Sequence, residues 1–424
     1  MPKYKLTYFD IRGLAESARM LFVIAGQEFE DVRLQQKEWP AIKPTTPFGR
    51  LPLLEVDGKV LPESRAINYY LAKEFNLYGA SNWEGAAIDV VGELVFDMMK
   101  PFGEFMFEKD EARKAELKKK YDEALPVGLE RLEGSLAKNN GGDGFFVGDK
   151  ISLADISVFN AFEYCVKGDN ATILDKYPKL KAWQARVASD EKIAAYLAQR
   201  KSTEKAAPGF GKPSDNTMPS YKLTYFDIKG RAEPVRMLFT VAGVPFEDVR
   251  IKQADWSAMK SKTPFGQLPF LEVDGKVLAQ TRAITYYVAR DLKLYGANNW
   301  ESAQIDVVGE LMFDLVRPYT EKIMFEKDEQ KKAENLKKYL SETAPTILAN
   351  VEEQLKKNKG GDGFFVGDKI SLADINVFSS FDFTSLPEKL DNMAKYPKLK
   401  ALLDRVKANK NMAAYLAKRK PSPY

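Results

Sequence analysis

The chain is a duplication, and this constrains its fold more than any other feature. The segment Lys5–Ile11 returns unchanged as Lys222–Ile228, and Phe145–Ile156 returns as Phe364–Ile375. Each copy is about 200 residues long, whereas stacked repeat proteins use units of about 20–50 residues. We therefore expect two related globular units, each with its own core and its own site.

The copies are joined by a segment that has the composition of a linker. Residues 201–218 are polar, contain Pro and Gly and lack hydrophobic periodicity. A flexible coil of roughly 18 residues spans about 25 Å on average and roughly 60 Å when extended, which lets the copies pair. The expected domains are α/β at 1–79 and 219–296, all-helical at 84–200 and 301–420, with 201–218 between the copies.

Composition excludes several classes of function. Lys and Arg (64) nearly balance Asp and Glu (60), which favours solvated helix faces over a nucleic-acid surface. The absence of histidine excludes Ser-His-Asp and Cys-His catalysis and histidine metal sites. The single cysteine, Cys165, is expected to be a buried structural thiol in a reducing compartment. No apolar run approaches the roughly 20 residues of a membrane span, so we expect a soluble, cytoplasmic protein.

The first part of each copy has the pattern of a small α/β domain. Period-2 and period-3.6 segments predict the order β-α-β followed by ββα. Gly26 ends the first helix, Asp57-Gly58 indicates a two-residue hairpin turn, and Ser64 is an N-cap residue. In copy one, the expected elements are a strand at 4–8, a helix at 18–25, a strand at 29–34 and a hairpin at 53–61.

The second part of each copy has a helical pattern throughout. It runs from about Trp83 to about residue 200 in copy one. Ser152 and Asp155 form a capping box, which Ser371 and Asp374 repeat in copy two. We expect these four residues to fix the start of a helix and to carry no chemistry.

Several residues of the α/β domain stand where a ligand could bind. Leu51-Pro52 is a candidate cis peptide whose backbone could pair with an extended, peptide-like ligand. Glu63-Ser64 begins a helix, where N–H groups favour a carboxylate. Trp39 and Lys43 lie in the irregular segment before the hairpin. Taken singly, these residues also fit a packed aromatic, a surface charge and a plain cap.

Together, these features resemble the cytosolic glutathione S-transferases. The β-α-β-ββα order, Tyr8, Leu51-Pro52 and Glu63–Ile67 carry the resemblance. The segments Tyr4–Asp10, Trp39-Pro40 and Pro47–Gly49 indicate the sigma class, which includes the glutathione-dependent prostaglandin D synthases. The resemblance covers nearly all of both copies except the linker. It implies a thioredoxin-like domain and an all-helical domain in each copy, an intramolecular pseudo-dimer within a monomeric chain, and glutathione as co-substrate.

The resemblance also implies roles for individual residues. Tyr8 and Tyr225 would each donate a hydrogen bond to the glutathione sulfur and favour the thiolate. Lowering a thiol pKa of about 8.5 by about two units needs roughly 2.7 kcal/mol, within reach of a charge-assisted hydrogen bond and local dipoles. Asp97 and Asp314 would each complete the site of the other copy. The remaining implied glutathione-binding residues are Trp39, Lys43, Leu51, Glu63 and Ser64 in copy one, and Trp256, Lys260, Leu268, Gln280 and Thr281 in copy two.

The copies depart from each other beside the catalytic tyrosine. Arg231 matches an arginine of many sigma-class members, whereas copy one has Leu14 at the same place. A guanidinium near the sulfur favours the thiolate, so we expect site two to activate glutathione more strongly. Some members of the class hold a metal between three acidic residues. Here Phe96 interrupts that set between Glu93 and Asp97, and no metal is expected.

The second substrate would lie against apolar side chains. Helix-spaced Met and Phe are also typical of a core, so this assignment is open. The expected electrophile pocket is lined by Phe9, Met98, Met99 and Phe102 in copy one, and by Phe226, Leu315, Val316 and Tyr319 in copy two.

The expected function is conjugation of glutathione to small hydrophobic electrophiles, with no nucleic acid or membrane as partner. A second possibility is glutathione-dependent isomerisation of a prostaglandin-like peroxide, or peroxide reduction, at the same sites. A third is a structural or ligand-carrying role, because the lens S-crystallins resemble sigma-class transferases but have lost most of their activity. Retention of the expected site residues in both copies argues against such a loss.

Overall fold

Two units follow one another along the chain. The computed structural model describes residues 2–200, 220–389 and 393–420. Contacts between Cα atoms separate Met1–Thr217, called copy one, from Met218–Tyr424, called copy two. The predicted linker at 201–218 lies outside the described residues. The predicted duplication is confirmed, while the individual domain boundaries stay predictions.

Each copy begins with a four-stranded mixed sheet. The strand order is β2-β1-β3-β4 in copy one and β6-β5-β7-β8 in copy two. β1 pairs in parallel with β2 and antiparallel with β3, and β3 pairs antiparallel with β4. Copy two repeats this pattern. The strands are β1 (Tyr4–Phe9), β2 (Glu30–Leu34), β3 (Leu53–Val56), β4 (Lys59–Pro62), β5 (Tyr221–Phe226), β6 (Glu247–Ile251), β7 (Phe270–Val273) and β8 (Lys276–Ala279).

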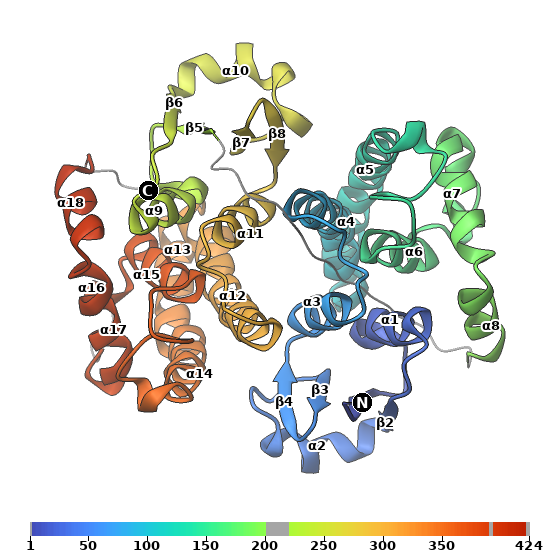
Figure 1. Ribbon diagram of the computed structural model, residues 1–424, viewed down its shortest axis with the longest axis horizontal. Helices are drawn as coiled ribbons and strands as arrows, with labels where there is room; N and C mark the ends of the chain where they lie inside the picture. Colours follow the sequence, from blue (N-terminus) through green and yellow to red (C-terminus); the bar gives the residue numbers. More distant parts are fainter. Residues whose placement is uncertain (1, 201–219, 390–392, 421–424) are drawn as a thin grey trace. The chain divides into compact units, whose positions relative to one another are not determined.

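Short helices complete each α/β domain in the predicted β-α-β-ββα order. In copy one, α1 and α3 lie side by side on one face of the sheet (Figure 1). A turn of 3-10 helix precedes the first helix of each copy, η1 (Gly13–Ala15) and η7 (Gly230–Ala232). The helices are α1 (Glu16–Ala25), α2 (Trp39–Ile42), α3 (Ser64–Glu74), α9 (Glu233–Ala242), α10 (Trp256–Met259) and α11 (Thr281–Asp291).

The local signals in the sequence explain these elements. Alternate side chains of the strands enter the core, where Leu6, Leu54 and Leu61 are fully buried. Gly26 ends α1 in the left-handed region, at φ 67°. Asp57 and Gly58 have φ values of 49° and 81°, as a type I′ turn requires at both central positions. The predicted helix stop and hairpin turn are confirmed.

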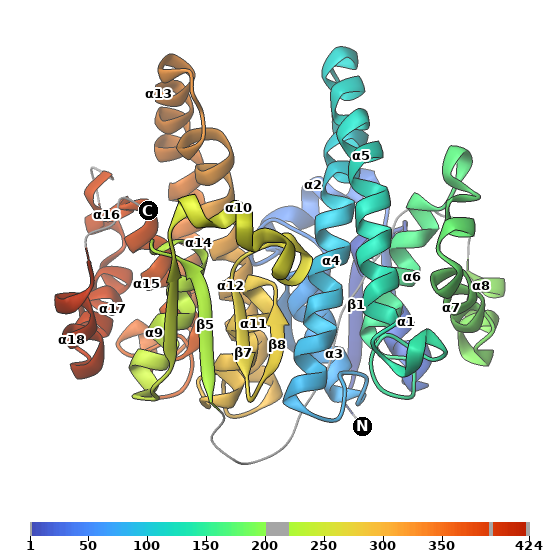
Figure 2. The same ribbon diagram turned by 90° about the horizontal axis from the view of Figure 1, so that it is seen from above.

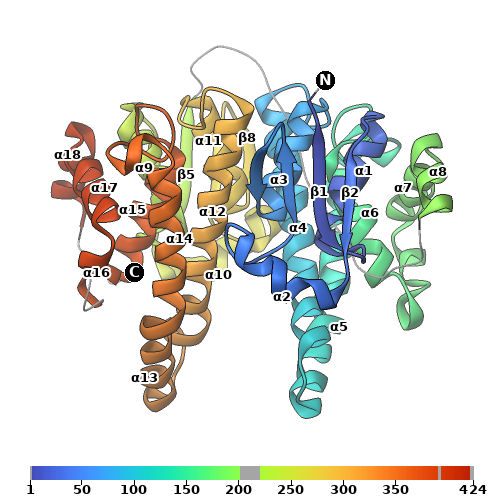
Figure 3. The same ribbon diagram turned by 90° about the horizontal axis from the view of Figure 1, so that it is seen from below.

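The rest of each copy is helical. In copy one, α4 and α5 form a long pair that packs along most of its length (Figure 2). In copy two, α12, α13 and α14 occupy the matching stretch (Figure 3). Two π-helical turns interrupt it, η11 (Thr320–Met324) and η12 (Tyr339–Thr343). The helices are α4 (Asn82–Phe107), α5 (Glu111–Leu136), α6 (Leu153–Cys165), α7 (Pro178–Ala188), α8 (Glu191–Gln199), α12 (Asn299–Tyr319), α13 (Glu329–Lys338), α14 (Ala344–Lys356), α15 (Leu372–Thr384), α16 (Leu386–Lys389), α17 (Pro397–Lys407) and α18 (Lys410–Lys418).

The capping box at α6 is a buried polar cluster. Ser152 caps the helix, and Asp155 accepts hydrogen bonds from the backbone of Ser152 (2.8 Å) and Phe146 (3.0 Å) and from Trp183 Nε1 (2.8 Å). Burial raises the pKa of the Asp155 carboxyl, although these hydrogen bonds act to lower it. Ser371 and Asp374 form the same box at α15. The predicted structural role of both pairs is confirmed.

The start of α3 differs from the prediction by one residue. Glu63 occupies the N-cap position and Ser64 is the first residue of the helix. The reason is the backbone of Glu63, whose φ of 70° interrupts the helical conformation before Ser64. Within the described ranges of both copies, no helix is long and apolar enough to cross a membrane.

Candidate functional site

The register of the sheet brings three predicted site segments to one end of each α/β domain. Thr7 pairs with Leu53, and Leu53 pairs with Pro62. The end of β1, the start of β3 and the end of β4 are therefore neighbours, together with Tyr8, Leu51 and Glu63-Ser64. Copy two aligns Thr224, Phe270 and Ala279 in the same way. The predicted cis bond occurs at Leu51-Pro52, and the matching Leu268-Pro269 bond of copy two is cis as well.

The hydroxyl of each predicted catalytic tyrosine lies against the 3-10 turn that follows its strand. A Cβ placed on Gly13 would come within 2.6 Å of the Tyr8 hydroxyl, and one on Gly230 within 2.8 Å of the Tyr225 hydroxyl. Both glycines have a φ of 46°. The Arg231 backbone N–H donates to the Tyr225 hydroxyl oxygen at 3.3 Å. A hydroxyl that accepts a backbone hydrogen bond keeps its own proton available for a ligand.

Burial keeps the Tyr8 phenol protonated. Tyr8 is 7% exposed, and desolvation raises the pKa of its hydroxyl. A hydrogen bond from the Leu14 backbone and the positive charge of Arg19 act in the opposite direction without cancelling this shift. At neutral pH, Tyr8 is therefore a hydrogen-bond donor rather than a phenolate.

An aromatic chain connects each tyrosine to the tryptophan predicted to bind the ligand. The ring of Phe9 lies edge-on to Tyr8 (5.6 Å between centroids) and to Trp39 (5.5 Å). In copy two, Phe226 contacts Tyr225 and Trp256, both at 5.5 Å. These contacts hold the segment that also carries the exposed Lys43 or Lys260 beside the end of the first strand.

The helix start at Glu63 is strained and has no cap from its own side chain. Glu63 has φ 70° and ψ 117°, and Gln280 has φ 70° and ψ 119°. Such a backbone conformation costs on the order of 1–3 kcal/mol and tends to occur at functional sites. Neither side chain makes a capping hydrogen bond, so neither occupies the backbone N–H groups at the start of α3 or α11. Ser64 and Thr281 are half-buried at these starts.

Ion pairs between the two domains of each copy fix the turn beneath the tyrosine. In copy one, Glu163 on α6 binds Arg12 (3.1 Å) and Arg200 (2.6 Å). In copy two, Asp382 on α15 binds Lys229 (3.5 Å) and Arg419 (2.9 Å). Arg12 and Lys229 come directly before Gly13 and Gly230, so the helical domain helps to position each turn.

The residues predicted to line the electrophile pocket lie in different surroundings. Phe102 contacts Tyr121 and Tyr164 through its ring, with centroids 5.4 and 6.0 Å apart. Met98 is 2% exposed and packs near Gly128 of α5, and Leu315 is fully buried. Met99 and Val316 are half-buried, as are Phe9, Phe226 and Tyr319. The two most buried members have the packing of core residues, and the pocket as a whole stays a prediction.

Two acidic residues are predicted to act across the copies. Asp97 is exposed on α4, and Asp314 is half-buried on α12. Each is described within its own copy, so completion of the opposite site stays a prediction. Glu93, the neighbouring acid of the interrupted metal set, forms an ion pair with Arg65, whose guanidinium also lies 5.5 Å from the centroid of Phe96.

Two residue types near the tyrosine were not predicted from the sequence. Gly13 and Gly230 support the hydroxyl, and their presence in both copies was the available signal. Arg19 and Arg236 are fully buried, and each donates to two backbone carbonyls of the segment around the turn. An arginine in an amphipathic helix pattern gives no sign of this role.

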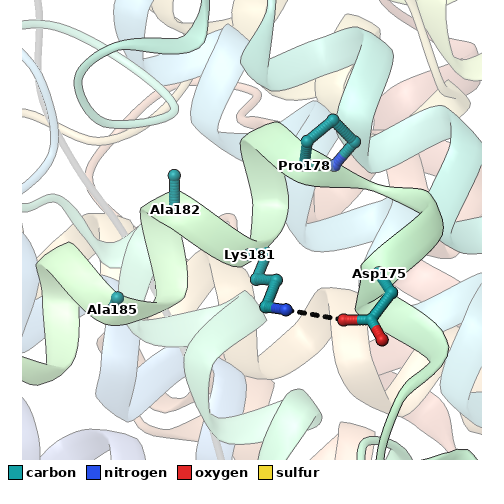
Figure 4. Close-up of a pocket in the computed structure, with 5 residues that line it drawn as sticks. All are labelled: Asp175, Pro178, Lys181, Ala182 and Ala185. Carbon is teal, nitrogen blue, oxygen red and sulfur yellow. Dashed lines mark hydrogen bonds and ion pairs between the residues drawn. The ribbon is translucent and has the colours of Figure 1, made fainter.

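A separate surface pocket lies in the helical domain of copy one (Figure 4). Its lining includes the ion pair between Asp175 and Lys181 (2.6 Å), both more than half exposed. None of the predicted site residues lines it. The remaining lining residues are Pro178, Ala182 and Ala185.

Comparison with known proteins identifies both halves of each copy. A family model described as the N-terminal domain of glutathione S-transferase matches residues 4–73 and 221–290. A model of the C-terminal domain matches residues 96–200 and 314–419.

Individual relatives each match about half of the chain over nearly their whole length. S-crystallin SL11 of Nototodarus sloanii is 40% identical over 204 residues, 48% of this chain and 99% of the relative. Probable glutathione S-transferase 7 of Caenorhabditis elegans is 38% identical over 205 residues, 48% of this chain and 99% of the relative. Hematopoietic prostaglandin D synthase of Gallus gallus is 40% identical over 204 residues, 48% of this chain and 98% of the relative.

Proposed function

The chain belongs to the glutathione S-transferase family, and we propose that it conjugates glutathione to small hydrophobic electrophiles at two sites, one in each copy. The single observation that carries this proposal is the packing of the tyrosine hydroxyl against the glycine of the following 3-10 turn. This packing occurs in both copies. The hydroxyl is a donor held in place before any ligand binds. A preorganised donor of this kind stabilises an anion without reorganisation.

The mechanism follows from the protonation states. The glutathione thiol releases its proton to water, and Tyr8 or Tyr225 donates a hydrogen bond to the resulting thiolate. The thiolate forms a bond between sulfur and the electrophilic carbon. In a substitution, the bond to the leaving group breaks and that group departs with the bonding electron pair. In copy one, the Tyr8 phenol keeps its proton throughout, because burial raises its pKa.

The binding residues follow the order of the tripeptide. Trp39 and Lys43 would hold the glycine end, Leu51 the cysteinyl backbone, and Glu63 with Ser64 the γ-glutamyl end. In copy two, Trp256, Lys260, Leu268, Gln280 and Thr281 would do the same. The N–H groups at the start of α3 and α11 support this arrangement, because they favour the carboxylate of the γ-glutamyl group.

The pairing of the copies is part of the proposal. The chain would be a monomer in which the two copies form a pseudo-dimer of the sigma class, acting in the cytoplasm. Asp314 would complete the site of Tyr8, and Asp97 that of Tyr225. Light scattering should give the mass of one chain in solution; a predominant two-chain species would count against this arrangement.

The experiment that tests the function is turnover of a model aryl halide with glutathione. The purified chain should form the thioether, and the Tyr8→Phe, Tyr225→Phe double variant should lose most of the rate. A chain without measurable turnover would instead fit the non-enzymatic alternative, which the similarity to S-crystallin SL11 favours. Glutathione affinity of the same samples would then show whether the sites still bind.

A second candidate activity is glutathione-dependent isomerisation of a prostaglandin endoperoxide, or peroxide reduction. The similarity to a prostaglandin D synthase of Gallus gallus favours it. It would use the same tyrosines and the same glutathione thiolate. Product analysis after incubation with the endoperoxide and with an organic hydroperoxide distinguishes these reactions from conjugation.

A further inference from the structure

In copy two, a lysine ammonium contacts a residue of the predicted electrophile pocket. Lys389 Nζ, at the end of α16, donates to the Tyr319 hydroxyl oxygen at 2.8 Å and to the Thr384 carbonyl at 2.7 Å. It also lies 4.9 Å from the centroid of the Tyr319 ring. An ammonium has three donors, so this geometry leaves one for a ligand.

This lysine is connected to the catalytic tyrosine by a short series of contacts. Tyr225 rests on Gly230, and the preceding residue, Lys229, binds Asp382 on α15. Phe383, the next residue of α15, contacts the Tyr319 ring with 6.3 Å between centroids. Lys389 is therefore linked to the turn beneath Tyr225 through α15 and the Tyr319 ring.

Lys389 differs from Lys229 and Arg419 in its partners. Lys229 and Arg419 both pair with the carboxylate of Asp382. Lys389 has only a phenol and a carbonyl as partners among the residues that the structure describes. A carboxylate would give this half-buried ammonium an acceptor of full opposite charge, which neither the phenol nor the carbonyl supplies.

Copy one lacks this feature. Asn170 stands at the same distance before Tyr177 as Lys389 stands before Tyr396, in the shared Tyr-Pro-Lys-Leu-Lys segment. Phe102, which matches Tyr319, has no hydroxyl and contacts Tyr121 and Tyr164 instead. The nearby Arg12, over the Tyr164 ring, is already paired with Glu163.

We propose that Lys389 determines the specificity of copy two by binding a carboxylate on the electrophile, whereas copy one takes uncharged electrophiles. The inference rests on the proposed function, because it names the second substrate of the same site. In the reaction, a bond forms between the glutathione sulfur and the electrophilic carbon, and the leaving group departs with its electron pair. The carboxylate of the substrate is unchanged and stays paired with Lys389.

The test compares two electrophiles that differ only in charge, a chloronitrobenzoate and its methyl ester. The full chain with Tyr8→Phe reports on copy two, and the chain with Tyr225→Phe reports on copy one. The readout is the ratio of kcat/KM for the benzoate to kcat/KM for the ester. Because both values come from one preparation, any loss of folded protein cancels.

We expect Lys389→Met to lower this ratio about tenfold in the Tyr8→Phe chain, the loss expected for one charge-assisted hydrogen bond. Lys389→Arg, which keeps the charge, should retain the ratio within about twofold. Lys400→Met, which removes an exposed lysine of α17, is the matched control and should leave the ratio unchanged. The Tyr225→Phe chain, which reports on copy one, should have a lower ratio than the Tyr8→Phe chain even though Lys389 is unchanged.

Two results would overturn the inference. One is an equal ratio in the two single-site chains; the other is a ratio that Lys389→Met and Lys400→Met change to the same extent. Failure of the proposed function has a different signature. If the Tyr8→Phe chain turns over neither electrophile, copy two has no transferase activity and this inference loses its basis.

Discussion

Copy one and copy two share the groups that hold the tyrosine and differ in the groups that would face the ligand. The glycine turn, the buried arginine of the first helix and the acid that precedes it recur as Gly13, Arg19 and Glu16, and as Gly230, Arg236 and Glu233. Leu14 and Arg231 stand at the same place on the turn, yet one is apolar and the other cationic. Duplication therefore kept the residues around the tyrosine, whereas the neighbouring residue on the turn changed from apolar to cationic between the copies.

The interdomain ion pairs show how the scaffold accommodates substitution. Copy one uses Arg12 and Glu163, and copy two uses Lys229 and Asp382. Both side chains are shorter in copy two, and the contact lengthens from 3.1 to 3.5 Å. The second arginine, Arg200 or Arg419, binds the same carboxylate in each copy. The change preserves the pairing of charges and hence the position of the turn.

The sharpest test of the comparison removes the two hydroxyls separately and together. Tyr8→Phe combined with Tyr225→Phe should lower kcat/KM for an aryl halide about 100-fold, the loss typical for one preorganised donor to an anion. Tyr225→Phe alone should remove the larger share, because Arg231 adds a positive charge to site two. Steady-state kinetics at saturating glutathione measures this, and equal residual activities of the two single variants would refute the asymmetry.

The second test asks whether the glycine turn supports the tyrosine. Gly13→Ala would place a methyl group within 2.5 Å of Tyr8 Cε1 and add strain at φ 46°. In the Tyr225→Phe chain, we expect about 10- to 100-fold slower turnover, because small displacements of a catalytic group cost rates of this order. Gly141→Ala is the matched control, since Gly141 has a φ of 66° and no atom within 4 Å of its added Cβ. A similar loss in both variants would assign the effect to backbone strain alone.

Local signals predicted most of the fold because they act through neighbouring residues. Gly26, the Asp57-Gly58 turn and the Ser152 capping box each specify their conformation without distant contacts. The start of α3 was misplaced by one residue because the positive φ of Glu63 is maintained by its surroundings rather than by its own preference.

The site was predictable in part and for a different reason. The role of Tyr8 was predicted through a resemblance that links segments far apart in the sequence, whereas Leu51-Pro52 was also a candidate from its local pattern. The role of Arg19 and the contact between Lys389 and Tyr319 depend on tertiary packing, which no local pattern encodes. The π-helical turns of copy two were missed for the same reason, since their sequence is compatible with continuous helices.

A smaller effect should follow from exchanging the residues that differ on the turn. Arg231→Leu in the Tyr8→Phe chain removes a cation beside the thiolate, so the pKa of bound glutathione should rise. In a plot of kcat/KM against pH, the rising limb should then move to higher pH. The shift should be only about 0.5 unit, because an exposed guanidinium is partly screened. Leu14→Arg in the Tyr225→Phe chain should move it to lower pH; Leu14 is 47% exposed, so little packing is lost. Shifts of the same sign in both chains would contradict the role given to Arg231.

The smallest effect expected concerns the pH profile of kcat/KM in copy one, which should show ionisation of the glutathione thiol and no second ionisation from Tyr8. Burial raises the pKa of Tyr8, so its phenol remains a donor as pH increases and loses its proton only above the ordinary tyrosine value of about 10. In the Tyr225→Phe chain, kcat/KM should therefore rise with ionisation of the glutathione thiol and then stay level up to about pH 10. Circular dichroism over the same range controls for unfolding. A fall in kcat/KM between about pH 8 and 9.5, with the fold intact, would mean that Tyr8 titrates early and that its proton is not the one held for the sulfur.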